Sequence, residues 1–126
     1  MSADNGIYIL ECKDQYRVIE AQAIENLFYD LFSNGSTNRL IPTRVVEYFG
    51  RSKYTRNKDL ALRIAQSMEK RNYTEYGVKT FTYGKTWKHI LEDAKKLAPL
   101  EIEVLKKRDN RNWDWEIKRL EEIINM

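Results

Sequence analysis

The strongest constraint on the fold lies near the start of the chain, where two apolar segments flank a short polar link, CKDQ. The segments read GIYILE (6–11) and YRVIEA (16–21). Both are rich in β-branched and aromatic residues, and two such runs around a short polar link predict a β-hairpin. In the first segment Ile7 and Ile9 face one way, whereas Tyr8 and Leu10 face the other. Apolar side chains on both faces indicate a central strand that is covered on both sides.

The rest of the chain alternates between helical and extended patterns. In the second strand of the hairpin, Arg17 and Glu20 mark positions that we expect to be less buried. Apolar residues with helical spacing predict helices over 23–32, 43–49, 58–70 and 86–97. The apolar stripe of the third of these helices consists of Leu60, Ala61, Ile64, Ala65 and Met68. Asn57 and Thr86 precede two of the helices as N-terminal caps, and YGVKTFTY (76–83) predicts a third strand.

The C-terminal segment predicts a further helix with one apolar seam. The seam residues are spaced 4, 3 and 4 apart on a helix from about residue 112 to 125, and they are Trp113, Ile117, Leu120 and Ile124. This seam packs either on its own domain or on a second copy of the chain. Trp115 lies about 200° around the helix from Trp113, so one core face cannot bury both rings. Trp115 therefore packs against another helix of the chain or faces solvent, and Pro99 separates this region from the helix before it.

Together these elements predict an α+β fold. The expected order is strand, strand, three helices, strand and two helices. We predict a small three-stranded antiparallel sheet, made of the N-terminal hairpin and one later strand, packed with four to five helices. A length of 126 residues is typical of one domain. We expect a single domain over 1–126, with a helical C-terminal extension over 99–126.

Composition narrows the class and the compartment. Hydrophobic residues make up 42% of the chain and charged residues 33%, which is unlike both disordered and membrane proteins. The N-terminus lacks the basic and apolar regions of a signal peptide. Cys12 is the only cysteine, so the chain forms no internal disulfide, which favours a reducing compartment. We expect a cytoplasmic protein with no contact to a membrane.

The residues of common catalytic sites are nearly missing. One histidine, His89, and one cysteine, Cys12, do not suffice for a structural zinc site. His89 falls away from the apolar stripe of its helix, and Cys12 lies at the hairpin turn as an ordinary thiol. The five glycines form no phosphate-binding loop. A carboxylate site built from distant acids such as Asp4, Glu20 and Glu75 stays open, although solvated surface is the better interpretation. We expect no enzyme, no cofactor and no metal.

A basic region occupies the middle of the chain. Residues 1–31 hold two basic and six acidic groups, whereas residues 43–72 hold eight basic and three acidic groups. The candidate residues for binding nucleic acid or an acidic partner are Arg44, Arg51, Lys53, Arg56 and Lys58. Such cations neutralise phosphates, and Tyr54 or Tyr73 among them offers a ring on which a base can stack. The plainer interpretation is a solvated surface.

Four blocks of the sequence resemble one known group of proteins. They are SADNGIYIL (2–10), YRVIEAQAIENL (16–27), EYFG (47–50) and YTEYGV (73–78). In these blocks the chain is similar to small, mostly uncharacterised proteins encoded by bacteriophages. The resemblance covers about residues 2–83 and leaves out the tail from residue 99. It implies a phage origin and a place in the cytoplasm of the infected cell, and it carries over no catalytic residue.

Two functional hypotheses follow from these patterns. The first is a stoichiometric inhibitor or modulator of a host defence system, for example of the anti-CRISPR type, because small phage proteins without an active site often act in this way. Its partner is a host protein or a protein–nucleic-acid complex, and its candidate contact or self-association residues are Trp113, Trp115, Ile117 and Leu120. The alternative is a nucleic-acid-binding accessory protein that uses the basic region 44–71.

Overall fold

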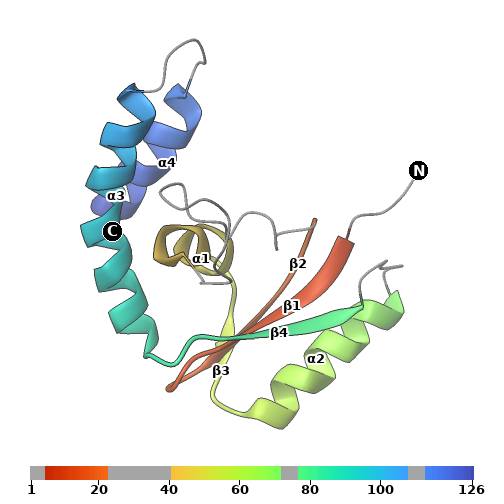
Figure 1. Cartoon of the computed structure of the whole chain (residues 1–126). Coiled ribbons are helices and arrows are strands. Elements are labelled where there is room, and N and C mark those ends of the chain that lie inside the picture. Colours follow the sequence, from red (N-terminus) through yellow and green to blue (C-terminus); the bar gives the residue numbers. More distant parts are fainter. Residues whose placement is uncertain (1–4, 23–40, 72–76, 108–112) are drawn as a thin grey trace.

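The computed structural model describes residues 5–22, 41–71, 77–107 and 113–126, which form four strands and four helices (Figure 1). In chain order the elements are β1 (Asn5–Glu11), β2 (Tyr16–Gln22), α1 (Pro42–Phe49), β3 (Tyr54–Thr55), α2 (Lys58–Arg71), β4 (Val78–Thr82), α3 (Trp87–Lys107) and α4 (Asp114–Ile124). The predicted α+β class is confirmed. The helix predicted over 23–32 lies outside the described residues.

The sheet has four strands in the order β3-β2-β1-β4 and is mixed. The predicted hairpin is confirmed, since β1 and β2 pair antiparallel with Glu11 opposite Tyr16. β4 pairs with β1 in parallel, with Ile7 opposite Val78, so the prediction of a three-stranded antiparallel sheet is wrong. β3 lies in the basic region, where the sequence predicted no strand. β3 runs antiparallel to β2, and α2 then carries the chain back along the sheet, so β4 enters in the same direction as β3 and β1.

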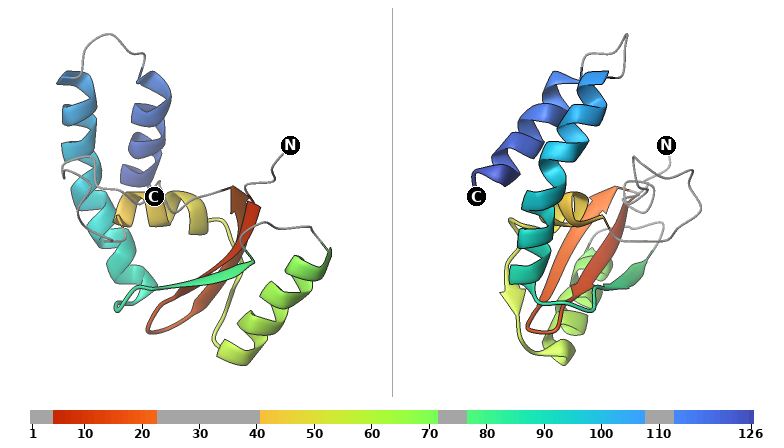
Figure 2. Two further views of the ribbon diagram at one scale, coloured as in Figure 1. Left: turned by 45° about the vertical axis from the view of Figure 1, so that its right-hand side comes forward. Right: turned by 60° about the vertical axis from the view of Figure 1, so that its left-hand side comes forward.

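The central strand β1 is covered on both faces, as its sequence predicts. Ile7 and Ile9 pack with Ala61 and Ala65 of α2. Tyr8 and Leu10, on the opposite face of β1, join a larger cluster with α1, α3 and α4. Figure 1 and Figure 2 show α2 on one side of the sheet and α1 with α3 on the other. The alternation of one strand therefore determines a three-layer arrangement of helices, sheet and helix.

The apolar stripe of α2 is narrower than its sequence predicts. Ala61 and Ala65 are buried against the sheet, whereas Leu60 and Ile64 are 45% and 39% exposed. Two small residues let the helix axis approach the sheet closely, so that the larger residues beside them point outward. The cap predicted at Asn57 is confirmed, because its Oδ1 accepts a hydrogen bond from the Leu60 amide at 3.2 Å.

Helix α3 continues through Pro99, so the predicted break at this residue is wrong. A proline inside a helix removes one backbone hydrogen bond, which usually interrupts the helix. Here Pro99 is exposed, while Ala98 and Ile102 are buried on either side of it and hold the helix against the core. The cap predicted at Thr86 is confirmed, since its Oγ1 accepts a hydrogen bond from the His89 amide at 3.3 Å.

Helix α4 lies beside α3 (Figure 2). Leu120 and Ile123 are buried, and Trp113 and Ile117 pack half-buried on the same cluster as Tyr8. The predicted seam is right except at its last position, where Ile123 replaces Ile124. Leu120 and Ile123 are three residues apart and so share one helix face, which is the face that packs on the core.

Arg17 contradicts its prediction, because only 7% of this residue is exposed. Its guanidinium donates hydrogen bonds to the carbonyl oxygens of Phe49 and Ser52, both at 2.8 Å, just where α1 ends. A cation at the carboxyl end of a helix satisfies its last carbonyls and complements its dipole. Glu20 is exposed as expected. Within the described ranges, no helix has the length and apolar character needed to cross a membrane.

Candidate functional site

The two tryptophans at the start of α4 have opposite surroundings. Trp113 is half-buried and packs on the core, whereas Trp115 is 64% exposed. Ile117 also packs half-buried on the core, and Leu120 is buried there. The seam of α4 therefore packs on its own domain. Of the four residues proposed for contact with a partner, Trp115 is the one whose ring is mostly open to solvent.

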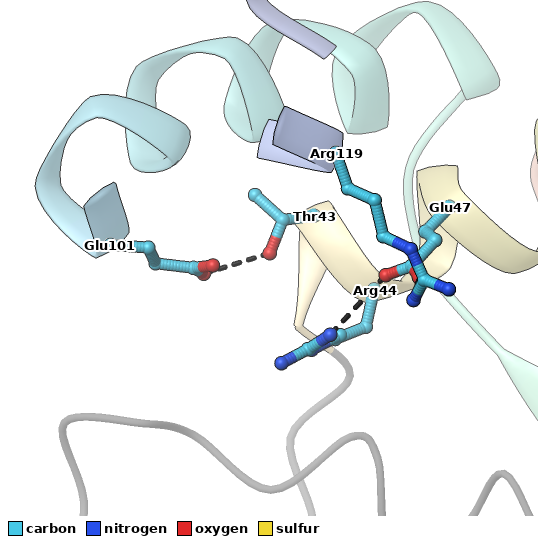
Figure 3. A network of polar contacts seen from close by, with 5 residues as sticks. All are labelled: Thr43, Arg44, Glu47, Glu101 and Arg119. Atoms are coloured by element: carbon cyan, nitrogen blue, oxygen red, sulfur yellow. Dashed lines mark hydrogen bonds and ion pairs between the residues drawn. The ribbon is translucent and has the colours of Figure 1, made fainter. Parts of the chain in front are cut away.

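Trp115 is joined to α1 through two charged side chains. The guanidinium of Arg119 lies 3.6 Å from the centre of the Trp115 ring, which is the geometry of a cation–π contact. The same guanidinium forms an ion pair with Glu47 on α1. Arg44 also reaches Glu47, at 3.3 Å, and Figure 3 shows the two arginines converging on this carboxylate. Arg119 is thus held in place between the ring and the acid.

These side chains border a groove of about 470 Å³ between α1 and α4, which we call the α1–α4 groove. Its lining residues are Val46, Glu47, Tyr48, Arg51, Trp115, Lys118, Arg119, Glu122, Ile123 and Met126. Arg51 and Trp115 come from the two candidate surfaces that the sequence analysis kept apart, and the fold brings them to one groove. Burial, followed by the nearby charge of Glu47, raises the pKa of the Tyr48 phenol, so its hydroxyl stays protonated at neutral pH.

Sequence reasoning missed most of this groove. Within α4 a signal exists, because Trp115, Arg119 and Glu122 are spaced 4 and 3 apart and so share one helix face. Nothing in the sequence places Tyr48 of α1 opposite that face. The contact depends on how both helices pack on α3, which is a property of the tertiary structure.

The remaining basic candidates gather on the stretch that links α1 to α2, residues 50–58, which we call the basic segment. Arg51, Lys53 and Arg56 are exposed there. Lys58 is exposed too, and its ammonium lies 3.7 Å from the Glu11 carboxylate. Arg44 is separate from this group, since it lies on α1 and pairs with Glu47.

Tyr54, the aromatic residue of the basic segment, lies beside the guanidinium of the buried Arg17. Tyr54 in β3 is 53% exposed, and the guanidinium of Arg17 lies 5.7 Å from the centre of its ring. The same guanidinium lies 4.0 Å from the ring of Trp87. Burial lowers the pKa of the Arg17 guanidinium below its ordinary value. Arginine nevertheless remains protonated near neutral pH.

Cys12 and His89 do not resemble an activated nucleophile and its base. Cys12 is buried, and burial, followed by the charge of Asp14, raises the pKa of its thiol to about 11. A thiol with such a pKa is almost fully protonated at neutral pH and is a weak nucleophile. His89 is exposed, with its ring Nδ1 2.9 Å from the Thr86 hydroxyl.

Metal-ligating groups are also dispersed. In the part of the chain that the structure describes, histidine, cysteine and carboxylate side chains form no cluster of three or more. Of the three distant acids considered for a carboxylate site, Glu20 is exposed, and Asp4 and Glu75 lie outside the described residues.

One buried acid escaped the sequence analysis. Glu101 of α3 is 2% exposed and accepts a hydrogen bond from the Thr43 hydroxyl of α1 at 2.7 Å (Figure 3). Helical spacing could have predicted the burial of Glu101, because this residue falls on the same helix face as Ala94, Ala98 and Leu105. The contact ties α1 to α3 and so helps to position one wall of the α1–α4 groove.

No family model, no curated protein and no solved structure matches this chain. Fold and surface together define a small α+β protein with two neighbouring features, a groove that holds an exposed tryptophan and a basic segment that holds an exposed tyrosine.

Proposed function

We propose that this chain is a small phage-encoded binding protein without enzymatic activity, which docks on a host protein through the α1–α4 groove. One observation carries this proposal: Trp115 is 64% exposed at the rim of the groove, with the Arg119 guanidinium 3.6 Å from its ring centre. Tryptophan and arginine are the residues most enriched at the energetic centres of protein interfaces. A ring that buries so little surface in its own domain contributes little to folding, which favours a role in binding.

The walls of the groove suit a protein partner. Two packed helices form them, so the groove exists before binding and little order has to be created. Arg119 is already oriented by Glu47 and by the Trp115 ring. Tyr48 and Met126 add aromatic and apolar surface, and the lining also includes charged residues of both signs. Protein–protein interfaces usually combine aromatic and apolar residues with charged ones.

The resemblance to phage proteins supports the class of partner. A phage protein that binds a host protein stoichiometrically has an obvious use against the host's defence. We therefore propose that it acts as an inhibitor or modulator of a host defence system, of which a CRISPR effector complex is an example. Binding through a groove needs no turnover, which agrees with a buried, protonated Cys12 and an exposed His89.

A photo-crosslinking amino acid in the groove wall tests the docking step. Placed at Lys118, it is expected to capture one partner in host cells, whereas the same group at the exposed Leu100 of α3 captures none. The change Trp115→Ala in the Lys118 background is expected to abolish the product. Equal capture at both positions, or capture that survives Trp115→Ala, contradicts the proposal.

The activity is tested on a bacterial lawn that carries the defence system under study. Expression of the wild-type chain is expected to restore plating of a restricted phage, and Trp115→Ala is expected to plate like the empty vector. Leu100→Ala is the matched control, because it also removes an exposed apolar side chain but lies outside the groove. Restoration by Trp115→Ala at the wild-type level would show that the groove does not mediate the function.

A further inference from the structure

The basic segment concentrates positive charge on an exposed stretch. Residues 50–58 hold four basic and no acidic side chains. Arg51, Lys53 and Arg56 are exposed, and no described residue forms an ion pair with them. Among the described residues Lys58 forms an ion pair with Glu11, at 3.7 Å, and an exposed pair of this length is weak. The charge of the segment is therefore available to a ligand.

One face of the Tyr54 ring is contacted by the guanidinium of Arg17. Tyr54 is the first residue of β3, and Arg17 on the neighbouring strand β2 lies opposite it in register. Arg17 is itself fixed by the carbonyl oxygens of Phe49 and Ser52 and by Gln15, whose side-chain oxygen accepts a hydrogen bond at 2.8 Å. A half-exposed ring on a fixed cation presents its surface with little conformational freedom left to lose.

We propose that the basic segment binds single-stranded nucleic acid, in which an unpaired base stacks on Tyr54 while Arg51, Lys53 and Arg56 contact the phosphates. Stacking on an aromatic ring combined with cations along the backbone is the general chemistry of single-strand binding. Residues 51–56 span at most about 18 Å when extended, a length that a few nucleotides can follow.

Other occupants use this surface less completely. An acidic peptide would meet the cations but gains nothing specific from an exposed aromatic plane. A duplex hides the faces of its bases, and the segment contains neither a helix nor a long ribbon to enter a groove. A peptide strand that pairs with the edge of the sheet finds only the two residues of β3. An unpaired nucleotide matches both the ring and the charges.

Fluorescence anisotropy with a labelled single-stranded oligothymidine of about 12 nucleotides tests the site. Binding is expected at low salt, and the logarithm of the association constant is expected to fall with that of the salt concentration with a slope of about −2, as three phosphate contacts require. Tyr54→Ala is expected to weaken binding about tenfold, while Tyr54→Phe retains it. Replacing Arg51, Lys53 and Arg56 by alanine together is expected to remove most of the salt dependence.

Two controls separate this site from the groove and from general charge. Trp115→Ala is expected to bind the oligonucleotide like the wild type. If the basic segment fails to bind the oligonucleotide, the proposed docking through the groove is not contradicted. If docking through the groove fails, oligonucleotide binding by the segment is not contradicted. Polyglutamate of similar length is expected to compete poorly. The proposal is overturned if no binding occurs at low salt, if the duplex binds more tightly than the single strand, if polyglutamate competes equally, or if Tyr54→Ala folds normally and binds with unchanged affinity.

Discussion

The α1–α4 groove and the basic segment meet at Arg51, yet they arrange their charges in opposite ways. In the groove, Glu47 pairs with both Arg44 and Arg119, so these two cations are matched with an acid of the protein itself. Along the basic segment, the exposed cations Arg51, Lys53 and Arg56 have no acidic partner among the described residues. The groove thus presents shape and fixed side chains, whereas the segment presents an open positive field.

This difference teaches what kind of recognition each surface supports. Matched charges contribute little long-range attraction, so an occupant of the groove gains affinity from close contact at Trp115. Unmatched charges attract phosphates over a distance that salt shortens to about 8 Å under physiological conditions. Binding in the groove is therefore expected to vary weakly with salt, and binding at the segment strongly.

The largest effect is expected from Arg17→Ala, which removes the support of the basic segment. The substitution leaves the carbonyl oxygens of Phe49 and Ser52 without their buried donor. We expect the free energy of unfolding to fall by about 3–5 kcal/mol, as for a broken buried charge network. Urea denaturation followed by circular dichroism measures this loss. Arg17→Lys keeps the positive charge but loses the planar guanidinium, so we expect its free energy of unfolding to lie between those of the wild type and Arg17→Ala. A loss below about 1 kcal/mol would show that Arg17 does not support the segment.

A smaller loss is expected when the groove is weakened from within the core. Leu120→Ala removes a buried side chain of α4, and such changes cost about 2–4 kcal/mol. Ile124→Ala on the same helix is the matched control, because Ile124 is partly exposed, and a loss of less than about 1 kcal/mol is expected. Differential scanning calorimetry compares the two. Equal losses of stability for the two variants would show that the seam ends at Ile124, the heptad position, and not at Ile123.

The comparison also explains what the sequence could predict. The hairpin, the coverage of β1 on both faces and the caps at Asn57 and Thr86 follow from local patterns, and the structure confirms them. β3 has only two residues and therefore no periodicity that predicts it. β4 pairs in parallel with β1, which is far from it in the sequence, so no local pattern predicts this pairing.

The same limit applies to the two surfaces. Helix geometry shows that Trp113 and Trp115 cannot share one face, but the position of α3 decides which of them is buried. Arg17 looks like a surface residue until the carbonyl end of α1 is placed beside it, 32 residues further along the chain. The sequence predicts the basic segment because its charged residues are close together in the chain. It does not predict the groove because the helices that form its walls are far apart in the chain.

A pH-dependent loss of stability is expected on the side of the molecule near Arg17. The pKa of the Cys12 thiol is raised from 9.0 to about 11, chiefly by burial, so the folded protein keeps its proton where the unfolded chain releases it. Stability from this residue is thus constant below pH 9 and falls between pH 9 and about 11, by at most about 2–3 kcal/mol. Urea denaturation of the wild type and of Cys12→Ala across this range isolates the effect. Parallel curves for the two proteins would contradict it.

The smallest effect is expected at Glu47, and it sharpens the contrast between matched and unmatched charge. Glu47→Gln removes the acid that holds both Arg44 and Arg119, and for partly exposed pairs we expect a loss of about 1 kcal/mol. This loss should shrink at about 0.5 M salt, because the pairs are screened. Glu103→Gln on α3, which changes an exposed acid outside the groove, is the control. Once Glu47 is neutral, the groove carries unmatched cations like the basic segment, so partner binding through Trp115 should become salt-dependent. If it remains insensitive to salt, the matched charges are not what distinguishes the two surfaces.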